Sequence, residues 1–291
     1  MIIANPIYDV VFKRMMENER VAKFFIGTLL DQQLVSIEVK PQEFTYKDND
    51  GVGFAVFRLD FIATIKTELG EHIKILIEIQ KARNLIDLMR FRRYLGEQYT
   101  KEDIINGEKV VLPITTIYIL GFNLPGIESA CIKVNRHYID LINKTVIESK
   151  NEFVEKLTHD CFIVQVNRIT DRFQTRLDKL LSLFEQRNFM NDEKTVKDYR
   201  YAIDNEDLKV TTDILHHTGT DPEERKKIEI EQEAWRSINA MFEPKEKEYW
   251  KKLEENRIAL EEKNKEIENK DKVIEDKDKI IEDLKRRLGD K

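Results

Sequence analysis

Two neighbouring segments of the chain place acidic and amide side chains inside apolar runs. Asp60 lies in the run FAVFRLDFIATI, between Leu59 and Phe61. Glu78 and Gln80 lie two residues apart in the run IKILIEIQ. Alternate residues of a β-strand point to the same face, so we expect Glu78 and Gln80 to share one face. If the two runs pair as a hairpin, three oxygen-bearing side chains can converge.

A set of oxygen ligands of this kind predicts a site for a hard divalent cation such as Mg²⁺. A bound cation of this type polarises a phosphoryl oxygen and lowers the pKa of a bound water, which is the chemistry of phosphodiester hydrolysis. The alternative is that charged residues fall near strand ends by chance. The metal interpretation gains weight because Glu78 lies among Ile and Leu residues, where a carboxylate is costly unless it is paired or metal-bound.

The segments around these runs predict a layered α/β core. Residues 5–30 have the apolar spacing of one or two amphipathic helices, with Asn5 as a cap and Pro6 in the first turn. The run IKILIEIQ is apolar on both faces, which indicates a strand buried in the centre of a sheet. Residues 84–106 have helical spacing, and we expect Gly107 to end that helix. Further strands are predicted in the runs SIEVKPQEF, VVLPITTIYILGF and CIKVNRHYIDLI.

The ordered set of motifs resembles the PD-(D/E)XK nuclease-family transposases, which are related to the recombination-promoting nucleases of bacteria. The resemblance covers residues 1–125 well and 126–240 loosely. It rests on an N-P-x-Y-D-x-x-F-K motif, an R-L-D strand, an I-E-I-Q strand, an R-x-x-x-Y helix pattern and a Leu-Pro step before an apolar strand. The residues that carry it are Asn5, Pro6, Tyr8, Asp9, Phe12, Lys13, Asp60, Glu78, Gln80, Arg90, Tyr94, Gly107, Leu112 and Pro113.

The resemblance implies a restriction-endonuclease-like fold, with a mixed central sheet flanked by helices. It also implies a metal-dependent DNA endonuclease linked to mobile elements, recombination or defence. Asp60 and Glu78 would be the metal carboxylates, with Mg²⁺ as the cofactor and Mn²⁺ as an alternative. Gln80 stands where the wider superfamily has a lysine, although this family typically has E-x-Q.

The glutamine leaves a catalytic charge unaccounted for. A lysine would orient the water and offset charge in the transition state, whereas Gln80 can only hydrogen-bond. Lys13 and Lys81 are the candidates to supply the cation, and Lys13 is preferred because Lys81 follows Gln80 and should face away from it. Asp9, one helical turn before Lys13, can complete the acidic cluster. Its alternative role is that of a first-turn helix acid stabilised by the helix dipole.

A basic patch follows the predicted metal strand. We expect Arg83, Arg90, Arg93 and Tyr94 to contact DNA, since arginine contacts to phosphate fix a duplex without reading its sequence. The alternatives are a solvated helix face, or an Arg90 that holds Glu78 or another acid of the site.

Composition narrows the function classes. The chain has a formal net charge of −6, so any DNA contact depends on a local basic patch. No apolar run reaches membrane-spanning length, no signal peptide is seen, and Cys131 and Cys161 are too far apart for a zinc motif, which together fit a cytoplasmic protein. No GxxxxGK[ST] loop is present, so a nucleotide cofactor is not expected.

The last 47 residues, 245–291, differ from the rest of the chain: 30 of them are charged, 15 of each sign. An apolar residue recurs every seventh position, at Leu253, Leu260, Ile267, Ile274, Ile281 and Leu288. This column predicts a coiled-coil-like helix that pairs with a second copy to form a homodimer, and the alternative is a lone charged helix. The expected division is therefore a nuclease-like core over 1–150, a helical region over 151–244 and a heptad-repeat helix over 245–291.

These patterns lead to one leading hypothesis and one rival. The leading hypothesis is a Mg²⁺-dependent DNA endonuclease with a dimerising C-terminal helix. The rival is a catalytically weak or inactive nuclease-fold protein that binds DNA or protein as a scaffold. The net charge of −6, the neutral Gln80 and the charged tail favour the rival.

Overall fold

The computed structural model describes residues 1–40, 43–47, 54–58, 61–81 and 85–289. The chain divides into two compact units, Met1–Glu233 and Ala234–Lys291, and each is described by itself. Among the described residues, none of the helices is both long enough and apolar enough to cross a membrane.

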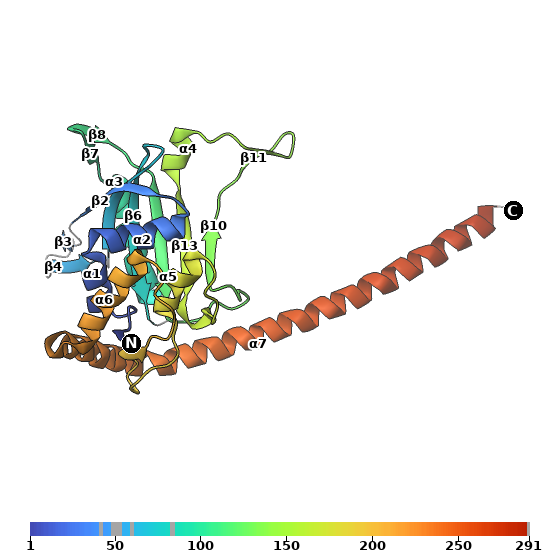
Figure 1. Cartoon of the computed structure of the whole chain (residues 1–291). Coiled ribbons are helices and arrows are strands. Elements are labelled where there is room, and N and C mark those ends of the chain that lie inside the picture. Colours follow the sequence, from blue (N-terminus) through green and yellow to red (C-terminus); the bar gives the residue numbers. More distant parts are fainter. Residues whose placement is uncertain (41–42, 48–53, 59–60, 82–84, 290–291) are drawn as a thin grey trace. The chain divides into compact units, whose positions relative to one another are not determined.

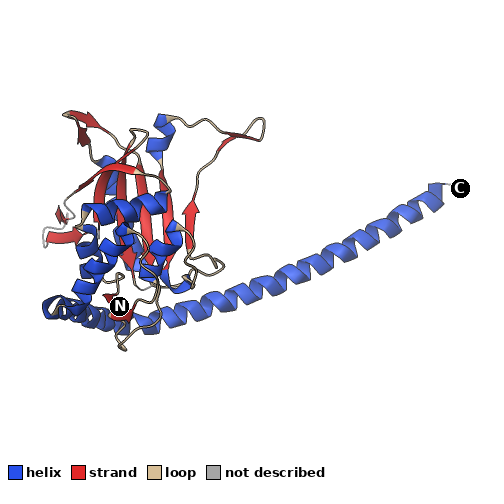
Figure 2. Ribbon diagram, in the orientation of Figure 1, coloured by secondary structure: helices blue, strands red, loops and turns tan. Residues whose placement is uncertain are grey.

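A mixed sheet of six strands forms the centre of the first unit (Figures 1 and 2). Strands β6, β9 and β13 are parallel, β5 and β2 extend the sheet antiparallel on one side, and β10 is antiparallel on the other. Phe61 pairs with Ile77 and Glu78 with Tyr118, which sets the register at the end of β6. In spatial order the strands are β10 (Cys131–Val134), β13 (His159–Gln165), β9 (Ile114–Leu120), β6 (His72–Gln80), β5 (Phe61–Thr67) and β2 (Leu34–Val39).

Helices cover both faces of this sheet, unequally. One face carries α1 (Asp9–Met16), α2 (Glu19–Leu30), α5 (Arg176–Phe184) and α6 (Glu206–Thr220), which lie on the near side of the sheet in Figure 1. Their side chains and the odd-numbered residues of β6 form the larger core. The other face carries α3 (Leu85–Thr100), whose Phe91 packs on Tyr118 of β9 with ring centres 4.5 Å apart. Alternation along β6 therefore assigns its odd and even residues to different layers.

Short paired strands and further helices complete the described chain. The two-stranded pairs are β1 (Ile2–Ala4) with β14 (Val196–Asp198), β3 (Glu43–Lys47) with β4 (Phe54–Arg58), β7 (Asp103–Ile105) with β8 (Glu108–Val110), and β11 (Tyr138–Asp140) with β12 (Thr145–Ile147). The remaining helices are α4 (Glu152–Leu157), a 3-10 turn (Val166–Arg168) and α7 (Pro222–Gly289).

The helix predicted over 84–106 ends earlier than expected. It stops at Thr100, and the following residues form the β7–β8 hairpin. Asn106 and Gly107 both have positive φ, at 52° and 85°, which suits the two-residue turn that joins hairpin strands. Gly107 therefore turns a hairpin and does not end the helix.

The expected boundary at residue 150 also differs from the structure. Strand β13 lies between β10 and β9, so residues 159–165 complete the central sheet. Helices α5 and α6 bury their apolar faces in the larger core, and residues 151–233 belong to the same unit as residues 1–150. A parallel strand can join its neighbour from far along the chain, and local periodicity carries no signal for that pairing.

Two helix starts differ in their caps. The side chain of Asp221 accepts hydrogen bonds from the amides of Glu223 and Glu224, both at 2.9 Å, at the start of α7. Asn5, by contrast, does not cap α1, because its side chain bonds to the 186–194 loop and to the amide of Ile7.

Candidate functional site

The carboxyl end of β6 holds the two described residues of the predicted metal site on one face. Glu78 is 0% exposed and Gln80 is 6% exposed, while Ile77 and Ile79 point into the larger core. Glu78 shares its layer with Leu76 and Tyr118, which belong to the apolar cluster under α3. The strand geometry thus places Glu78 and Gln80 side by side, as their spacing predicts.

The Glu78 carboxylate is bound by a cation from the next helix. Arg90 of α3 donates from Nη2 to Oε1 of Glu78 at 2.9 Å, and the Arg90 side chain is 37% exposed while that of Glu78 is fully buried. This is the alternative role that the sequence left open for Arg90. The pair compensates the buried carboxylate, since an ionised group in a dry layer is stable only with a partner.

Tyr118 shows how dry this layer is. Burial raises the pKa of the Tyr118 phenol well above its usual range, and the nearby Cys161 and Glu78 raise it further. A low-dielectric setting of this kind strengthens any charge interaction made by Glu78.

Gln80 has a side-chain donor with no partner among the described residues. Its Nε2 atom is buried and makes no hydrogen bond there, whereas its backbone oxygen accepts from the amide of Gly121 at 2.8 Å. Gly121 itself cannot carry a side chain, because a Cβ would lie 2.8 Å from the Lys81 oxygen. A buried amide group with unused hydrogen-bonding capacity is unusual, since most such groups are paired.

Other predicted members of the site lie outside the described residues. These are Asp60, the second metal carboxylate, and Arg83, a predicted DNA contact. Within the part of the chain that the structure describes, no group of three or more His, Cys, Asp or Glu side chains is arranged to hold a metal ion.

Asp9 and Lys13 lie on the opposite side of β6 from Glu78. They pair with each other, Nζ to Oδ2, at 2.7 Å on the first turns of α1, which packs on the larger core. Among the described contacts, none joins them to Glu78 or Gln80. Oδ1 of Asp9 is buried and makes no hydrogen bond to a described residue. The structure therefore does not bring these two predicted catalytic residues to the Glu78 layer.

Glu231 organises this opposite side, and sequence reasoning missed it. Its carboxylate accepts from the amides of Asp9 at 2.9 Å and Val10 at 3.2 Å, which satisfies the start of α1, and it also pairs with Lys81. Lys81 lies over the ring of Tyr8, 3.8 Å from its centre. Lys81 thus faces away from Gln80, as predicted. The only signal for Glu231 in the sequence is an acid on a helix, 150 residues away from Lys81.

The predicted DNA-contacting set is divided by the structure. Arg93 lies on an exposed part of α3. Tyr94 is 1% exposed and packs in the apolar cluster under α3, so the expectation that it touches DNA is corrected. The helical spacing from Arg90 to Tyr94 places both on the inward side of α3.

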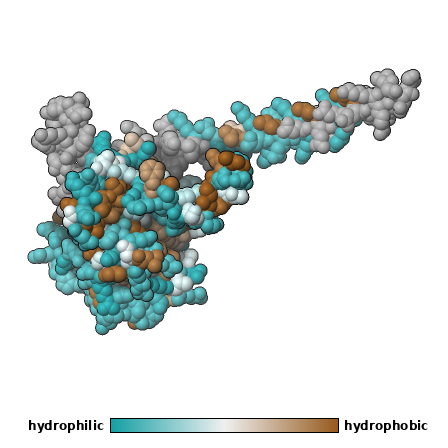
Figure 3. All heavy atoms as spheres, turned by 90° about the horizontal axis from the view of Figure 1, so that it is seen from above, coloured by the Kyte–Doolittle hydropathy of each residue, from teal (hydrophilic) through white to brown (hydrophobic). Residues whose placement is uncertain are grey.

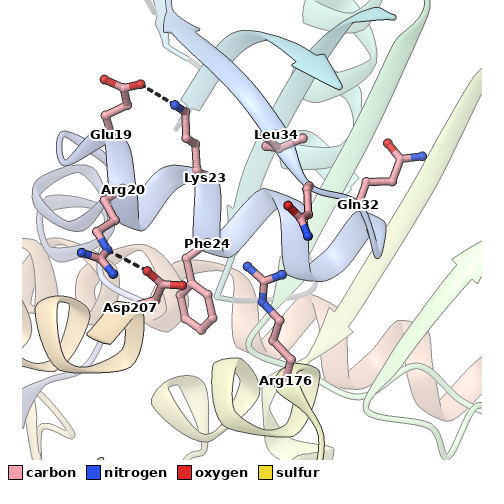
Figure 4. A pocket seen from close by; sticks show the side chains of 9 residues that line it. Glu19, Arg20, Lys23, Phe24, Gln32, Leu34, Arg176 and Asp207 are labelled. Atoms are coloured by element: carbon pink, nitrogen blue, oxygen red, sulfur yellow. Dashed lines mark hydrogen bonds and ion pairs between the residues drawn. The ribbon is translucent and has the colours of Figure 1, made fainter. Parts of the chain in front are cut away.

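A cavity of about 690 Å³ lies elsewhere (Figure 4). Two of its three helix cations are paired with acids: Arg20 with Asp207 and Lys23 with Glu19, both at 2.7 Å. Its described lining includes neither Glu78 nor Gln80. The residues that line it are Glu19, Arg20, Lys23, Phe24, Gln32, Gln33, Leu34, Arg176 and Asp207.

Comparison of the chain with protein-family models, with curated proteins and with solved structures finds no match.

Proposed function

We propose that the protein is a metal-dependent DNA endonuclease whose site lies at the carboxyl end of β6. The observation that carries the proposal is the buried Glu78 carboxylate beside the buried Gln80 amide, whose Nε2 has no partner among the described residues. Buried polar groups without a complete set of partners are a mark of functional sites.

The order of elements supports a restriction-endonuclease-like core, which is part of the proposal. The antiparallel pair β5–β6 is followed by α3, which crosses to the parallel neighbour β9. Glu78 and Gln80 end the strand from which this crossover starts. Ligand sites in open α/β sheets commonly lie at the carboxyl ends of such strands.

The oxygen ligands in the described part of the site are of the chemical type that a hard cation prefers. The Glu78 carboxylate and the Gln80 amide oxygen are ligands of the type that Mg²⁺ and Mn²⁺ accept. Asp60, which precedes Phe61 in the sequence, is the proposed third ligand. When bound, the cation would supply Lewis-acid activation of the phosphodiester and of a water.

The chain's own residues have separate tasks in this proposal. Arg90 compensates the charge of the Glu78 carboxylate and fixes its direction through the 2.9 Å contact. Gln80 orients a water through its amide. Arg93, on the exposed part of α3, and Arg83 hold the phosphate backbone of a duplex.

The test is cleavage of supercoiled plasmid DNA with Mg²⁺ or Mn²⁺. We expect Glu78→Gln and Asp60→Asn to lower the nicking rate by more than about 100-fold, because each removes a charge that holds the cation. Glu71→Gln is the matched control, since Glu71 is an exposed acid just before β6. Equal nicking by the wild type and all three variants would remove the site.

A specific observation favours the rival function, a weakly active or inactive nuclease fold that acts as a scaffold. Arg90 already compensates Glu78 without a metal, and Gln80 adds no charge. Calorimetric titration with Mn²⁺ separates the two functions. Binding heat in the wild type that is lost in Glu78→Gln supports the endonuclease, whereas no heat in either protein supports the scaffold.

A further inference from the structure

The second unit contains a seven-residue repeat whose chemistry is more regular than its apolar column alone. Four consecutive heptads read LEEKNKE, IENKDKV, IEDKDKI and IEDLKRR over residues 260–287. They lie in α7, where Leu260, Ile267, Ile274 and Ile281 are between 47% and 63% exposed. Figure 3 shows hydrophobic side chains recurring along this helix at intervals.

Charged residues of fixed sign flank the apolar column. A glutamate directly follows five of the six apolar residues of the column, at positions 254, 261, 268, 275 and 282. A lysine stands three residues after the apolar residue in three successive heptads, at positions 263, 270 and 277. A residue that recurs every seven positions stays near one face of a helix. The column therefore has a row of acids along one edge and a row of lysines along the other.

We propose that this segment pairs with a second copy of the chain as a parallel, in-register, two-stranded coiled coil. The apolar column takes heptad position d, the glutamates take e and the lysines take g. The proposal does not depend on the nuclease activity, because it uses only residues 253–288.

Charge complementarity selects the second copy and its direction. In a parallel pair, each g residue faces the e residue of the following heptad on the partner. Lys263 then faces Glu268 of the partner subunit, and Lys270 and Lys277 meet Glu275 and Glu282 in the same way. Every one of these contacts joins opposite charges, and each occurs twice in the dimer.

The other arrangements place like charges together. An antiparallel pair sets g against g and e against e, so lysines meet lysines and glutamates meet glutamates. Assigning the apolar column to position a instead of d makes Glu266 face Asp271 and Lys252 face Arg257. The parallel pairing with the column at d is therefore the arrangement in which the repeated e and g charges agree, while Asp271 and Asp278 at position a meet their own copies.

Heptad position a, the second position of the coiled-coil core, limits the assembly to two chains and weakens it. Arg257, Asn264, Asp271 and Asp278 fall at position a. A polar a residue specifies register and strand number at a cost in stability. Two strands leave these side chains nearer to water than three or four strands would, and burial of unpaired charge is costly. We expect a dimer whose dissociation constant rises with salt.

Charge reversal in the full-length protein tests the pairing. The wild type should have about twice the 34.6 kDa monomer mass by light scattering at low salt. Lys263→Glu with Lys270→Glu, and separately Glu268→Lys with Glu275→Lys, should each raise the dimer dissociation constant by about tenfold or more. An equimolar mixture of the two double variants should recover the dimer, because every pair is again opposite in charge.

This test needs a control for folding, and three outcomes would contradict the proposal. Circular dichroism should show that both double variants fold like the wild type apart from the helicity that pairing adds, so the lost mass reports pairing. A wild-type monomer at all concentrations, a wild-type trimer, or a dimer that survives both reversals would overturn the proposal.

Disulfide cross-linking tests the direction. In a parallel in-register pair, position 264 meets itself across the axis, so Asn264→Cys should form a covalent dimer under mild oxidation. Glu262→Cys, on the outer position f, is the matched control, and the wild type gives the background from Cys131 and Cys161. An Asn264→Cys variant that cross-links no better than Glu262→Cys would overturn the parallel register.

Discussion

The two faces of β6 treat buried charge in different ways. On the α3 side, Glu78 has a partner 12 residues later, and that partner, Arg90, is 37% exposed. On the helix-rich side, Lys81 pairs with Glu231, and both side chains are at most 14% exposed. Glu231 also caps α1. The cation on the α3 side is partly exposed, whereas on the opposite side both members of the ion pair are largely buried.

The two sides therefore differ in what their polar groups contact. Gln80 keeps a buried Nε2 with no partner among the described residues, and Glu78 is paired with an arginine that is partly exposed. The Glu231 carboxylate, by contrast, accepts hydrogen bonds from two backbone amides and pairs with one ammonium group. Changing one partner on each face tests whether the two faces differ in this way.

The largest effect is expected on the α3 side. Arg90→Met should destabilise the protein by about 3 kcal/mol, because it removes the arginine that compensates the buried Glu78 carboxylate. If the Glu78 layer binds a divalent cation, Mn²⁺ should stabilise this variant more than the wild type, since the metal replaces the missing charge. Urea unfolding with and without Mn²⁺ measures both effects.

The matched control for this experiment is on the other face. Lys81→Met should not be rescued by Mn²⁺, because Glu231 keeps its backbone amide donors. Equal rescue of both variants would show that Mn²⁺ acts on the protein nonspecifically.

The next effect concerns Glu231. Glu231→Ala should cost about 2 kcal/mol of unfolding free energy, because it removes a charged helix cap together with an ion pair. Glu229→Ala, an exposed acid on the same helix, should change stability by less than about 0.5 kcal/mol. The nicking rate of folded Glu231→Ala should remain near that of the wild type, and a large loss would place Glu231 in the catalytic site.

A buried amine on the helix-rich side gives a pH-dependent effect. Lys197 donates to the carbonyl oxygens of Glu185 at 2.6 Å and Ser182 at 3.1 Å, and burial lowers its pKa from 10.5 to about 7. Between about pH 7 and 10.5 the unfolded chain therefore binds one proton more than the folded chain, and stability rises with pH.

Lys197→Met removes this titration. The stability of the wild type relative to the variant should increase by about 2 kcal/mol between pH 7 and pH 9. The measurement is a denaturant midpoint at each pH. A difference that stays flat over this range would show that Lys197 is charged in the folded protein.

The smallest effect is expected at Lys13. Its pair with Asp9 is partly exposed, so Lys13→Met should change stability by less than about 1 kcal/mol. Since Lys13 lies on the other side of β6 from Glu78, its loss should change nicking no more than Arg14→Met does. A selective loss in Lys13→Met would restore Lys13 as the cation that Gln80 cannot supply.

Some features of the fold could be predicted from the sequence, because they depend only on residues that are close together in the chain. The run IKILIEIQ predicted a central strand buried on both faces, and Lys74–Gln80 are all buried. Alternation predicted that Glu78 and Gln80 share a face and that Lys81 faces away.

Other features were not readable because two distant segments decide them. Gly107 was assigned to a helix end since hairpin pairing is not visible from helical spacing. The sequence predicts a helical region over 151–244, whereas residues 159–165 form β13 and complete the sheet between β9 and β10. Tyr94 was read as a surface residue, and only its packing under the sheet makes it core.

The sequence by itself determined periodicities: which residues of β6 point the same way, and which residues of 253–288 line one edge of a helix. These follow from backbone geometry, which acts over a few residues. The tertiary structure alone decided the partners: that Arg90 binds Glu78, that Glu231 caps a helix more than 200 residues earlier, and that Asp9 and Lys13 lie across β6 from Glu78. Partner choice depends on which distant surfaces the hydrophobic core brings together, and no local pattern encodes it.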